Sequence, residues 1–501
     1  MANSGKVSKG LTYKTKSKLI FGIAVALLLL IVGGYFVYIT GIVTKIVPAV
    51  RIDQTVGDQT KTIGKAYVPE LNYYRNQILS MYSMYGLGVD EGYLDTVDEA
   101  TGKTNSQLIY DQAAEQLMNV RLVNEQAKKD AGFVCGADRY AAHQVELLED
   151  RSSSKFSSVN QYLAAVYGTG MSVSTFKQIV ADQSMTQEYE QYLRQFTFAP
   201  TQEELDKAYD ENTNGFTTVN FNGYLFDSET FGDDAEKYAE AVAAAAKDSE
   251  TFNTAIIEQI GEDVAESIGF TVEANTSYFS SVSRTSIEGE AFPEGLEEFA
   301  FDTANVGKAK VIEFKDKGWY VALLDKVDDK TDPTFSYREI VLVNEYASEE
   351  DAKESKIVSE CDKLEKQAEE IKAGITDELS FVSAVKKYTE NYDAIATGGY
   401  TSGVSSDVYQ TEYTAENVVS FGAWIADPAR QHGDMLIVRE SDNSKVTLYY
   451  FDESVPEWAD TVSGDIISAK VNDWSQTALN VSSTVPYVAY DLAEKLTYYA
   501  R

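Results

Sequence analysis

The chain has very few of the residues that usually build metal sites and nucleophile sites. Its 501 residues include two histidines, His143 and His432, and two cysteines. A zinc site needs a cluster of such ligands, and a nucleophilic serine or cysteine needs a histidine beside it. We therefore predict no metal, no cofactor and no catalytic triad. His143 is expected to be an exposed or capping residue of a helix, and His432 a turn residue.

Other chemical signatures are also missing. Cys135 and Cys361 are too few for a disulfide scaffold, so buried free thiols are expected, with one disulfide as the alternative. No glycine-rich loop suited to a phosphate is present, and Gly398-Gly399 is typical of a turn after a helix. Asp328, Asp329 and Asp332 lack the glycine and distal glutamate of a calcium loop, so a solvated linker is expected there.

Positive charge is scarce as well. The chain has 43 lysines and arginines against 79 aspartates and glutamates, a formal net charge of −36. Nucleic acid and anionic lipid surfaces both need a basic footprint, so neither is an expected partner. The simplest interpretation of the charge is that it keeps an exported protein soluble.

One long apolar run is present. Residues 19–43, LIFGIAVALLLLIVGGYFVYITGIV, carry no charge, and five lysines without any acidic residue precede them. A helix of this length exceeds a bilayer core of about 30 Å. We predict a cytoplasmic tail over 1–18, a transmembrane signal-anchor over 19–43, and an extracytoplasmic remainder with a charge of about −41. A cleaved signal peptide is the alternative, although the run is long for one.

The next region, 44–214, is predicted to be helical after one or two short strands near Val50–Val56. The apolar spacing predicts successive helices, which are expected at 69–85, 105–131, 138–149, 159–167, 174–194 and 201–212. A Gly- and Asp-rich loop is expected between the first two helices. Thr201 and Glu204 have the spacing of a capping box.

Two later segments, 215–329 and 334–453, share one predicted order of elements: strand, helix, helix, loop, short helix and hairpin. This pattern indicates an internal duplication. An antiparallel sheet covered by helices is the α+β arrangement expected for each segment. The remaining residues, 454–501, have helical periodicity and little left to pack on except the early helices. We therefore expect the two ends of the extracytoplasmic chain to meet.

Helices, then two small α+β units, then a returning helix resemble the SurA/PrsA-like family of exported foldases with parvulin-type prolyl isomerase modules. SVNQYLAAVYGTGMSVSTFKQIV and APTQEELDKAYDEN resemble the family's helical region. FSYREIVLV, FVSAVKKYTENYDAIATGGY and LEEFAFDTANVGKAKVIEFKDKGWYVALL resemble parts of a parvulin. The resemblance implies a multidomain α+β protein with a helical chaperone domain, completed by the C-terminal helices, and two parvulin-like domains.

The family's catalytic residues are not found at the matching positions. The opening-strand histidine of a parvulin corresponds to Gly223 in the first segment and Glu339 in the second. The histidine of the last strand corresponds to Tyr320 and Thr447. Neither cysteine matches the family's position. The resemblance therefore implies degenerate grooves with little or no isomerase activity, and no catalytic residue is assigned.

Tyrosines are dense in the helical region. Tyr74, Tyr82, Tyr85, Tyr162 and Tyr167 are the candidates for contact with unfolded chains, because tyrosine combines apolar area with a polar tip. Half or more of these tyrosines are expected to be ordinary packing residues.

The sequence thus favours a membrane-anchored extracytoplasmic chaperone or foldase that binds unfolded exported polypeptides without a cofactor. One alternative is an active peptidyl-prolyl cis-trans isomerase that works without histidines. Another is a surface scaffold or envelope-assembly protein with one fixed partner.

Overall fold

The computed structural model describes residues 42–87, 89–152, 155–211, 213–287, 291–349, 351–405 and 421–491, together with residues 28, 32 and 493. The predicted tail 1–18 and nearly all of the predicted anchor 19–43 therefore lie outside the described residues. Among the residues that are described, no helix combines the length and the apolar character needed to span a bilayer. The described chain is α+β, with helices and three small antiparallel sheets.

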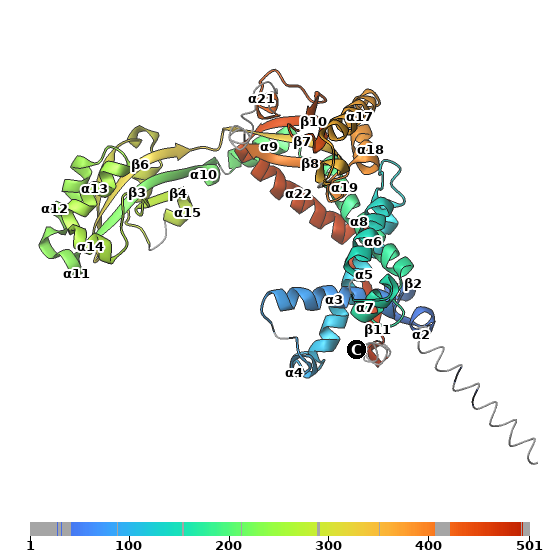
Figure 1. The fold of residues 1–501 in the computed structure, drawn as a ribbon. Coiled ribbons are helices and arrows are strands. Elements are labelled where there is room, and N and C mark those ends of the chain that lie inside the picture. The colour runs from blue at the N-terminus through green and yellow to red at the C-terminus, as the bar shows by residue number, and fades with distance from the viewer. Residues whose placement is uncertain are drawn as a thin grey trace, which may run out of the picture.

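Three bodies form an open arch (Figure 1). The helical lobe, residues 42–197 with residues 481–488, lies at the right of the view, below the inner unit. The inner unit, residues 333–456, lies above it. The outer unit, residues 218–328, stands apart on the left. A long helix, α22 (Glu457–Ala478), runs from the inner unit back along the lobe.

The helical lobe is built from amphipathic helices around one apolar core. Its main helices are α3 (Val68–Met84), α5 (Asn105–Ala127), α6 (Ala137–Ser152), α7 (Val159–Tyr167) and α8 (Val173–Tyr192). The next helix, α9 (Gln202–Glu211), packs on α22 beside the inner unit (Figure 1). Thr104 and Gln107 form a capping box that starts α5, and the predicted capping box of Thr201 and Glu204 is confirmed before α9. Two short helices, α2 (Ile42–Ile46) and α4 (Glu91–Asp95), complete the lobe, and α4 lies where a loop was expected.

The two ends of the described chain meet in a three-stranded sheet. The expected early strands are present as the hairpin β1 (Pro48–Val56) and β2 (Gln59–Tyr67). β11 (Thr484–Val488) pairs with the other side of β1, with Val50 opposite Val488. The meeting of the ends is therefore confirmed, but the expectation of a helix over 484–488 was wrong. This segment alternates buried and exposed residues, and Pro486 is tolerated because β11 is an edge strand.

The outer and inner units have the same sheet topology. In the outer unit the strands are β3 (Thr218–Asp227), β4 (Tyr278–Ser283), β5 (Ala309–Phe314) and β6 (Gly318–Asp328), in the order β4-β3-β6-β5. In the inner unit they are β7 (Pro333–Val343), β8 (Tyr400–Ser405), β9 (Met435–Arg439) and β10 (Lys445–Pro456), in the order β8-β7-β10-β9. β4 and β8 lie where the sequence predicted loops.

The helices of the two units also correspond. The outer unit has α12 (Ala235–Ala245) and α13 (Ser249–Ile260) after its first strand, and the short α16 (Leu296–Ala300) before its hairpin. The inner unit has α17 (Glu354–Ala373), α18 (Glu378–Tyr388) and the short α21 (Phe421–Ile425) at the same places. Four very short helices complete the units: α11 (Ser228–Phe231), α14 (Glu262–Ser267), α15 (Arg284–Ile287) and α19 (Ala394–Thr397). The predicted elements are present in the predicted order, with β4 and β8 as additional strands within the predicted loops.

Local details repeat at equivalent positions. β4 reads YFSSVS and β8 reads YTSGVS. Within them, Ser281 (φ +51°) and Gly403 (φ +68°) are both left-handed, and each lies at a break in the pairing with the first strand. α13 and α18 each begin with an aspartate that forms a capping box, Asp248 and Asp377. A repeated bulge with a residue of positive φ is strong support for an internal duplication.

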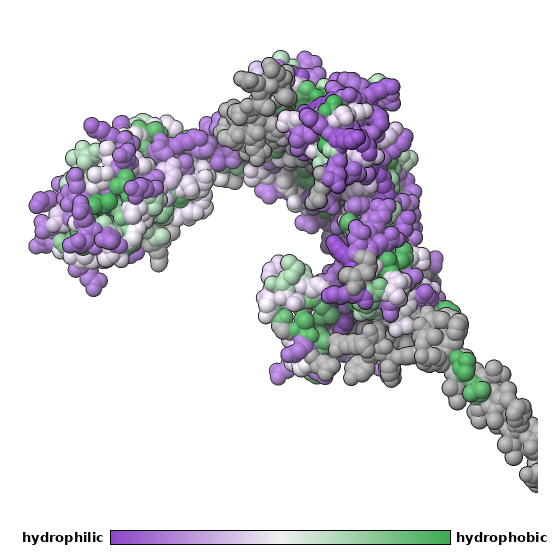
Figure 2. Space-filling view, in the orientation of Figure 1, coloured by the Kyte–Doolittle hydropathy of each residue, from purple (hydrophilic) through white to green (hydrophobic). Residues whose placement is uncertain are grey.

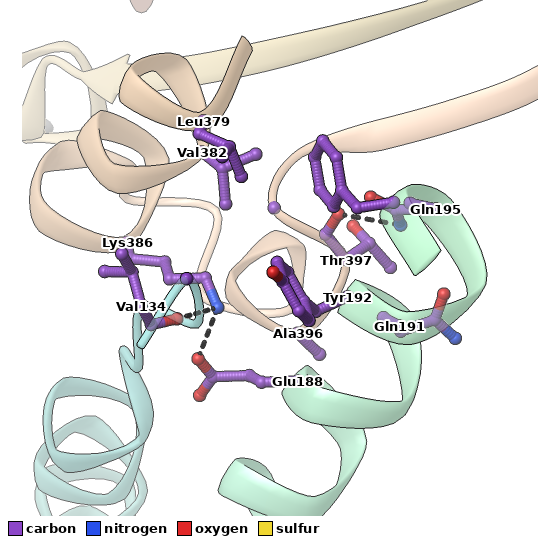
Figure 3. A pocket seen from close by; sticks show the side chains of 13 residues that line it. Val134, Glu188, Gln191, Tyr192, Gln195, Leu379, Val382, Lys386, Ala396 and Thr397 are labelled. Carbon is purple, nitrogen blue, oxygen red and sulfur yellow. Dashed lines mark hydrogen bonds and ion pairs between the residues drawn. The ribbon is translucent and has the colours of Figure 1, made fainter. Parts of the chain in front are cut away.

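A buried ion pair joins the helical lobe to the inner unit (Figure 3). Lys386 of α18 donates from Nζ to Glu188 Oε2 of α8 at 2.8 Å, and to the Val134 carbonyl at 2.6 Å. The side chains of Lys386 and Glu188 are 5% and 0% exposed. Glu188 also accepts from the Gly136 N–H and the Ser184 hydroxyl, so its burial is compensated.

The junction is closely packed around this ion pair. A space of only about 10 Å³, room for roughly one water, is left beside the ion pair. His143 of α6 stacks on Tyr392 of the inner unit, with ring centroids 3.7 Å apart. The expectation that His143 is an exposed or capping residue was therefore wrong. Buried charge and stacked rings together hold the lobe and the inner unit in one orientation.

The outer unit is attached differently. Its two apolar clusters contain only its own residues among those described. The chain enters it after α10 (Thr213–Phe216) and leaves it through the linker that follows Asp328. Three rings, Tyr209, Phe216 and Trp458, pack at this point, with Tyr209 and Trp458 centroids 4.3 Å apart. In the linker, Lys330 pairs with Glu457 at 3.1 Å and with Asp328 at 3.6 Å.

We predict that Lys386→Met will lower the free energy of unfolding by about 3 kcal/mol, because it leaves the Glu188 carboxylate buried without its cation. Urea unfolding measures the loss. Lys387→Met is the matched control, because Lys387 is exposed on the same helix and its replacement should change stability by less than about 0.5 kcal/mol. Equal effects of the two substitutions would contradict the importance of the buried pair.

Candidate functional site

The concave side of the arch is the largest feature that could receive a partner. Figure 2 shows an open hollow between the outer unit and the end of α3, which projects from the lobe on the same side. The fixed junction sets the angle between the lobe and the inner unit. The narrow connection through α10 and the linker after Asp328 determines how far the outer unit stands from the rest of the chain. The hollow is therefore a property of the whole fold and not of one domain.

The end of α3, which projects from the lobe on this side, carries exposed apolar side chains. All buried residues of α3 lie in its first part, Val68–Ile78. Beyond it, Met81, Met84, Tyr85 and Leu87 are 46%, 87%, 79% and 49% exposed. We call these four residues the apolar tip. α3 therefore extends past the core of the lobe beyond Ile78.

The five candidate tyrosines are distributed over different environments. Tyr85 belongs to the apolar tip. Tyr82 is half-buried, and its hydroxyl lies 3.1 Å from Gln112 Oε1. Tyr162 and Tyr167 are also half-buried and pack on Phe156 and Phe176. Tyr74 is only 3% exposed and belongs to the lobe core, so its assignment to a client-contacting surface is corrected.

The parvulin-like groove positions fall together in each unit. In the outer unit Gly223 is opposite Ala322 and Tyr320 is opposite Leu225. In the inner unit Glu339 is opposite Tyr449 and Thr447 is opposite Val341. Tyr320 and Thr447 are thus placed alike. Each pairs with a first-strand residue that comes two residues after Gly223 or Glu339, respectively. The register makes Gly223 equivalent to Glu339, and Tyr320 equivalent to Thr447.

The outer unit fills its groove with its own side chains. A Cβ atom on Gly223 would lie 2.0 Å from the Tyr320 hydroxyl, so the tyrosine occupies the space beside the glycine. Phe292 packs edge-on against the Tyr320 ring, and also against Phe221 and Phe279. The Tyr320 hydroxyl is buried without a partner among the described residues, and burial raises its pKa.

The inner unit has aromatic packing on the corresponding face. Phe421 of α21 stacks on Tyr449 with ring centroids 4.1 Å apart, and Tyr337 contacts both rings. Glu339 accepts a hydrogen bond from Asn391 at 3.3 Å, and Thr447 is 2% exposed. Burial raises the pKa of Glu339. Neither groove offers a histidine or a cysteine at the equivalent positions.

A second cavity lies at the junction, with a volume of about 530 Å³. Arg338 of β7 is 1% exposed on its wall and donates from Nε to Glu378 at 2.9 Å and from Nη1 to Gln195 at 3.0 Å. Its guanidinium also lies over the rings of Phe196 and Tyr400. Arg338 thus links the inner unit to the π-helical turn Leu193–Thr197 at the end of α8. Sequence analysis did not single out Arg338, Glu188 or Lys386.

The same cavity holds the described residues best able to bind a metal, Glu378, His432 and Asp452. Several of their ligand atoms already have hydrogen-bonding partners. His432 Nδ1 lies 2.9 Å from the Asp452 carbonyl, its Nε2 lies 3.1 Å from the Tyr450 hydroxyl, and Glu378 is paired with Arg338. His432 is therefore bonded through both ring nitrogens, which the expectation of a simple turn residue did not include. Burial and then the Glu378 carboxylate raise the pKa of Asp452 to about 6.

The two cysteines are both free. Cys361 is buried in the inner unit, as expected, but Cys135 is exposed. Asp328, in the predicted solvated linker, accepts from Lys326 at 3.2 Å and from the Lys330 N–H at 3.0 Å.

No protein-family model matches this chain, and no curated protein compared with it has a significantly similar sequence.

We predict that Gly223→Ala will destabilise the outer unit by about 1–3 kcal/mol, because the new methyl group overlaps the Tyr320 side chain. Gly464→Ala is the matched control: nothing lies within 4 Å of its Cβ position, and it should stabilise α22 by about 0.5–1 kcal/mol. Thermal unfolding should show a loss of stability for Gly223→Ala and a gain of stability for Gly464→Ala. Tolerance of the alanine at residue 223 would mean that the groove is open.

We predict that Asp452→Asn will raise the free energy of unfolding near neutral pH by about 1–3 kcal/mol, because it removes a buried charge. The folded-state pKa lies above the usual value of about 3.9, so the wild-type chain loses stability as pH rises between about 4 and 6. The advantage of the variant should therefore shrink toward pH 5 in denaturant titrations.

Asp427 is the control, because its replacement by asparagine is expected to have the opposite effect on stability. Hydrogen bonding from the Ala429 N–H lowers its pKa, so Asp427→Asn should destabilise the chain near neutral pH. If the free energies of unfolding of wild type and Asp452→Asn differ by the same amount at every pH, the raised pKa of Asp452 is contradicted.

Proposed function

We propose that the chain is a membrane-anchored, extracytoplasmic chaperone or foldase of the SurA/PrsA-like kind that holds unfolded exported polypeptides. The observation that carries the proposal is the open arch, in which the end of α3, with the exposed side chains of the apolar tip, projects on the same side as the outer unit. Solvent-exposed methionine, leucine and tyrosine side chains at one place suit adaptable contact with many apolar segments.

The repeated topology supports the same proposal. Two units of equal strand order, inserted between a helical lobe and a returning helix, agree with the arrangement expected of this family. The units would act as arms that bound the hollow, the inner one fixed and the outer one carried on a narrow connection. The anchor, residues 19–43, would keep the arch at the membrane surface.

The packing of the grooves favours binding over catalysis. A prolyl isomerase must admit a proline ring and lower a barrier of about 18–20 kcal/mol to rotation about the amide bond. In the outer unit, Tyr320 and Phe292 occupy the groove, and the inner unit packs Phe421 on Tyr449. Transient burial of client side chains needs neither a nucleotide nor a metal.

We predict that the full-length chain in nanodiscs will suppress aggregation of an unfolded client without ATP, as measured by light scattering. Met84→Ser combined with Tyr85→Ser should remove most of this effect, because it deletes the two most exposed side chains of the apolar tip. Val264→Ser with Ile268→Ser is the matched control, since these residues are 46% and 56% exposed on the outer unit.

Four results would count against the proposal. The chain could fail to suppress aggregation, or the two double variants could lose activity equally. Marked acceleration of cis-trans exchange in a proline peptide would instead favour the isomerase, and capture of one dominant protein from membranes would favour the scaffold.

A further inference from the structure

The surroundings of the apolar tip are strongly acidic. Between Arg75 and Lys103 the chain has no lysine, arginine or histidine, but it has Asp90, Glu91, Asp95, Asp98 and Glu99. Lys103 pairs with Asp111 at 2.6 Å. Every charge that follows the tip up to that lysine is therefore negative.

The first of these acidic groups, Asp90 and Glu91, follow the tip within four residues of Leu87 in the chain. The Asp90 side chain accepts from the Tyr93 N–H at 2.9 Å and so begins α4, which lies directly after the tip. Hydrogen bonds from the Thr101 hydroxyl and N–H lower the pKa of Asp98, so it stays charged at neutral pH. Asp95 and Glu99 are exposed.

An apolar surface with an acidic border discriminates between partners by charge. It attracts segments that carry lysine or arginine beside apolar residues, and it repels acidic segments and anionic lipid headgroups. Methionine side chains add tolerance for apolar residues of different shape. The negative charge near the tip thus favours basic client segments over acidic ones. The apolar surface alone does not make this distinction.

We propose that the apolar tip binds client segments in which lysine or arginine residues flank a short apolar run. This inference rests on the proposed chaperone function and names the chemistry of its clients. The acidic border would increase the rate of encounter with such segments and would hold neutral segments only through the apolar contact.

The test uses the full chain in nanodiscs of zwitterionic lipid and three labelled peptides of equal length. The peptides share one apolar run and carry lysine, serine or glutamate at the flanking positions. Fluorescence anisotropy should show the lysine peptide binding most tightly and the glutamate peptide least tightly. Added salt should reduce this difference.

Two variants separate the charge effect from the apolar effect. Asp95→Asn with Glu99→Gln should weaken the lysine peptide by about twofold to tenfold and leave the serine peptide unchanged. Glu236→Gln with Glu240→Gln, which removes two exposed charges from α12, is the matched control and should change neither. Met84→Ser with Tyr85→Ser should weaken all three peptides.

Equal binding of the lysine and glutamate peptides would overturn the inference, as would an Asp95→Asn, Glu99→Gln variant that behaves as wild type. Tip-dependent binding of added anionic vesicles would assign the surface to lipid instead. If aggregation suppression fails but the charge preference holds, the proposed function falls and this inference stands. If suppression succeeds without any charge preference, only this inference falls.

Discussion

The arrangement of the arch depends on one buried contact, the ion pair of Glu188 and Lys386. An ion pair that is almost fully buried costs free energy of desolvation, and it is tolerated here because both groups have further hydrogen-bonding partners. A nonspecific apolar interface could slide, whereas these donors and acceptors fit in one register. The contact therefore fixes where the inner unit lies on the helical lobe and so helps to shape the hollow.

The duplicated units show how one scaffold can serve two purposes. In the outer unit Asn222 of β3 accepts from Ser249, the first residue of α13. At the equivalent place in the inner unit, Arg338 of β7 donates to Glu378, the first residue of α18, and also reaches Gln195 of the lobe. The short neutral contact in the outer unit stays within that unit. The longer charged contact in the inner unit also joins that unit to the lobe. The difference between the outer unit and the docked inner unit can thus come from a few polar side chains.

Much of the fold could be predicted because it depends on local and periodic signals. The helices of the lobe follow their apolar spacing and caps, and the two units follow a repeated order of elements. The strands β4 and β8 were missed because serine, glycine and a left-handed residue are typical of loops, and only pairing across the sheet makes these segments strands. β11 was missed because a short amphipathic segment does not reveal from its own sequence that it will pair with β1 as a strand.

The candidate site was less predictable for a related reason. Tyr85 was identified from its residue type, but Tyr74 has the same type and is buried, since exposure depends on where α3 leaves the core. Residues such as Glu188, Lys386 and Arg338 act through partners far away in the sequence, and no local pattern marks them.

The central claim is that clients are held on the concave side of the arch. Site-specific photo-crosslinking tests it most directly, with the probe at residue 85 on the apolar tip or at residue 369, an exposed position on α17 of the inner unit. We expect an unfolded client to crosslink efficiently at residue 85 and weakly at residue 369. Equal crosslinking at both positions, or crosslinking at residue 369 alone, would contradict it.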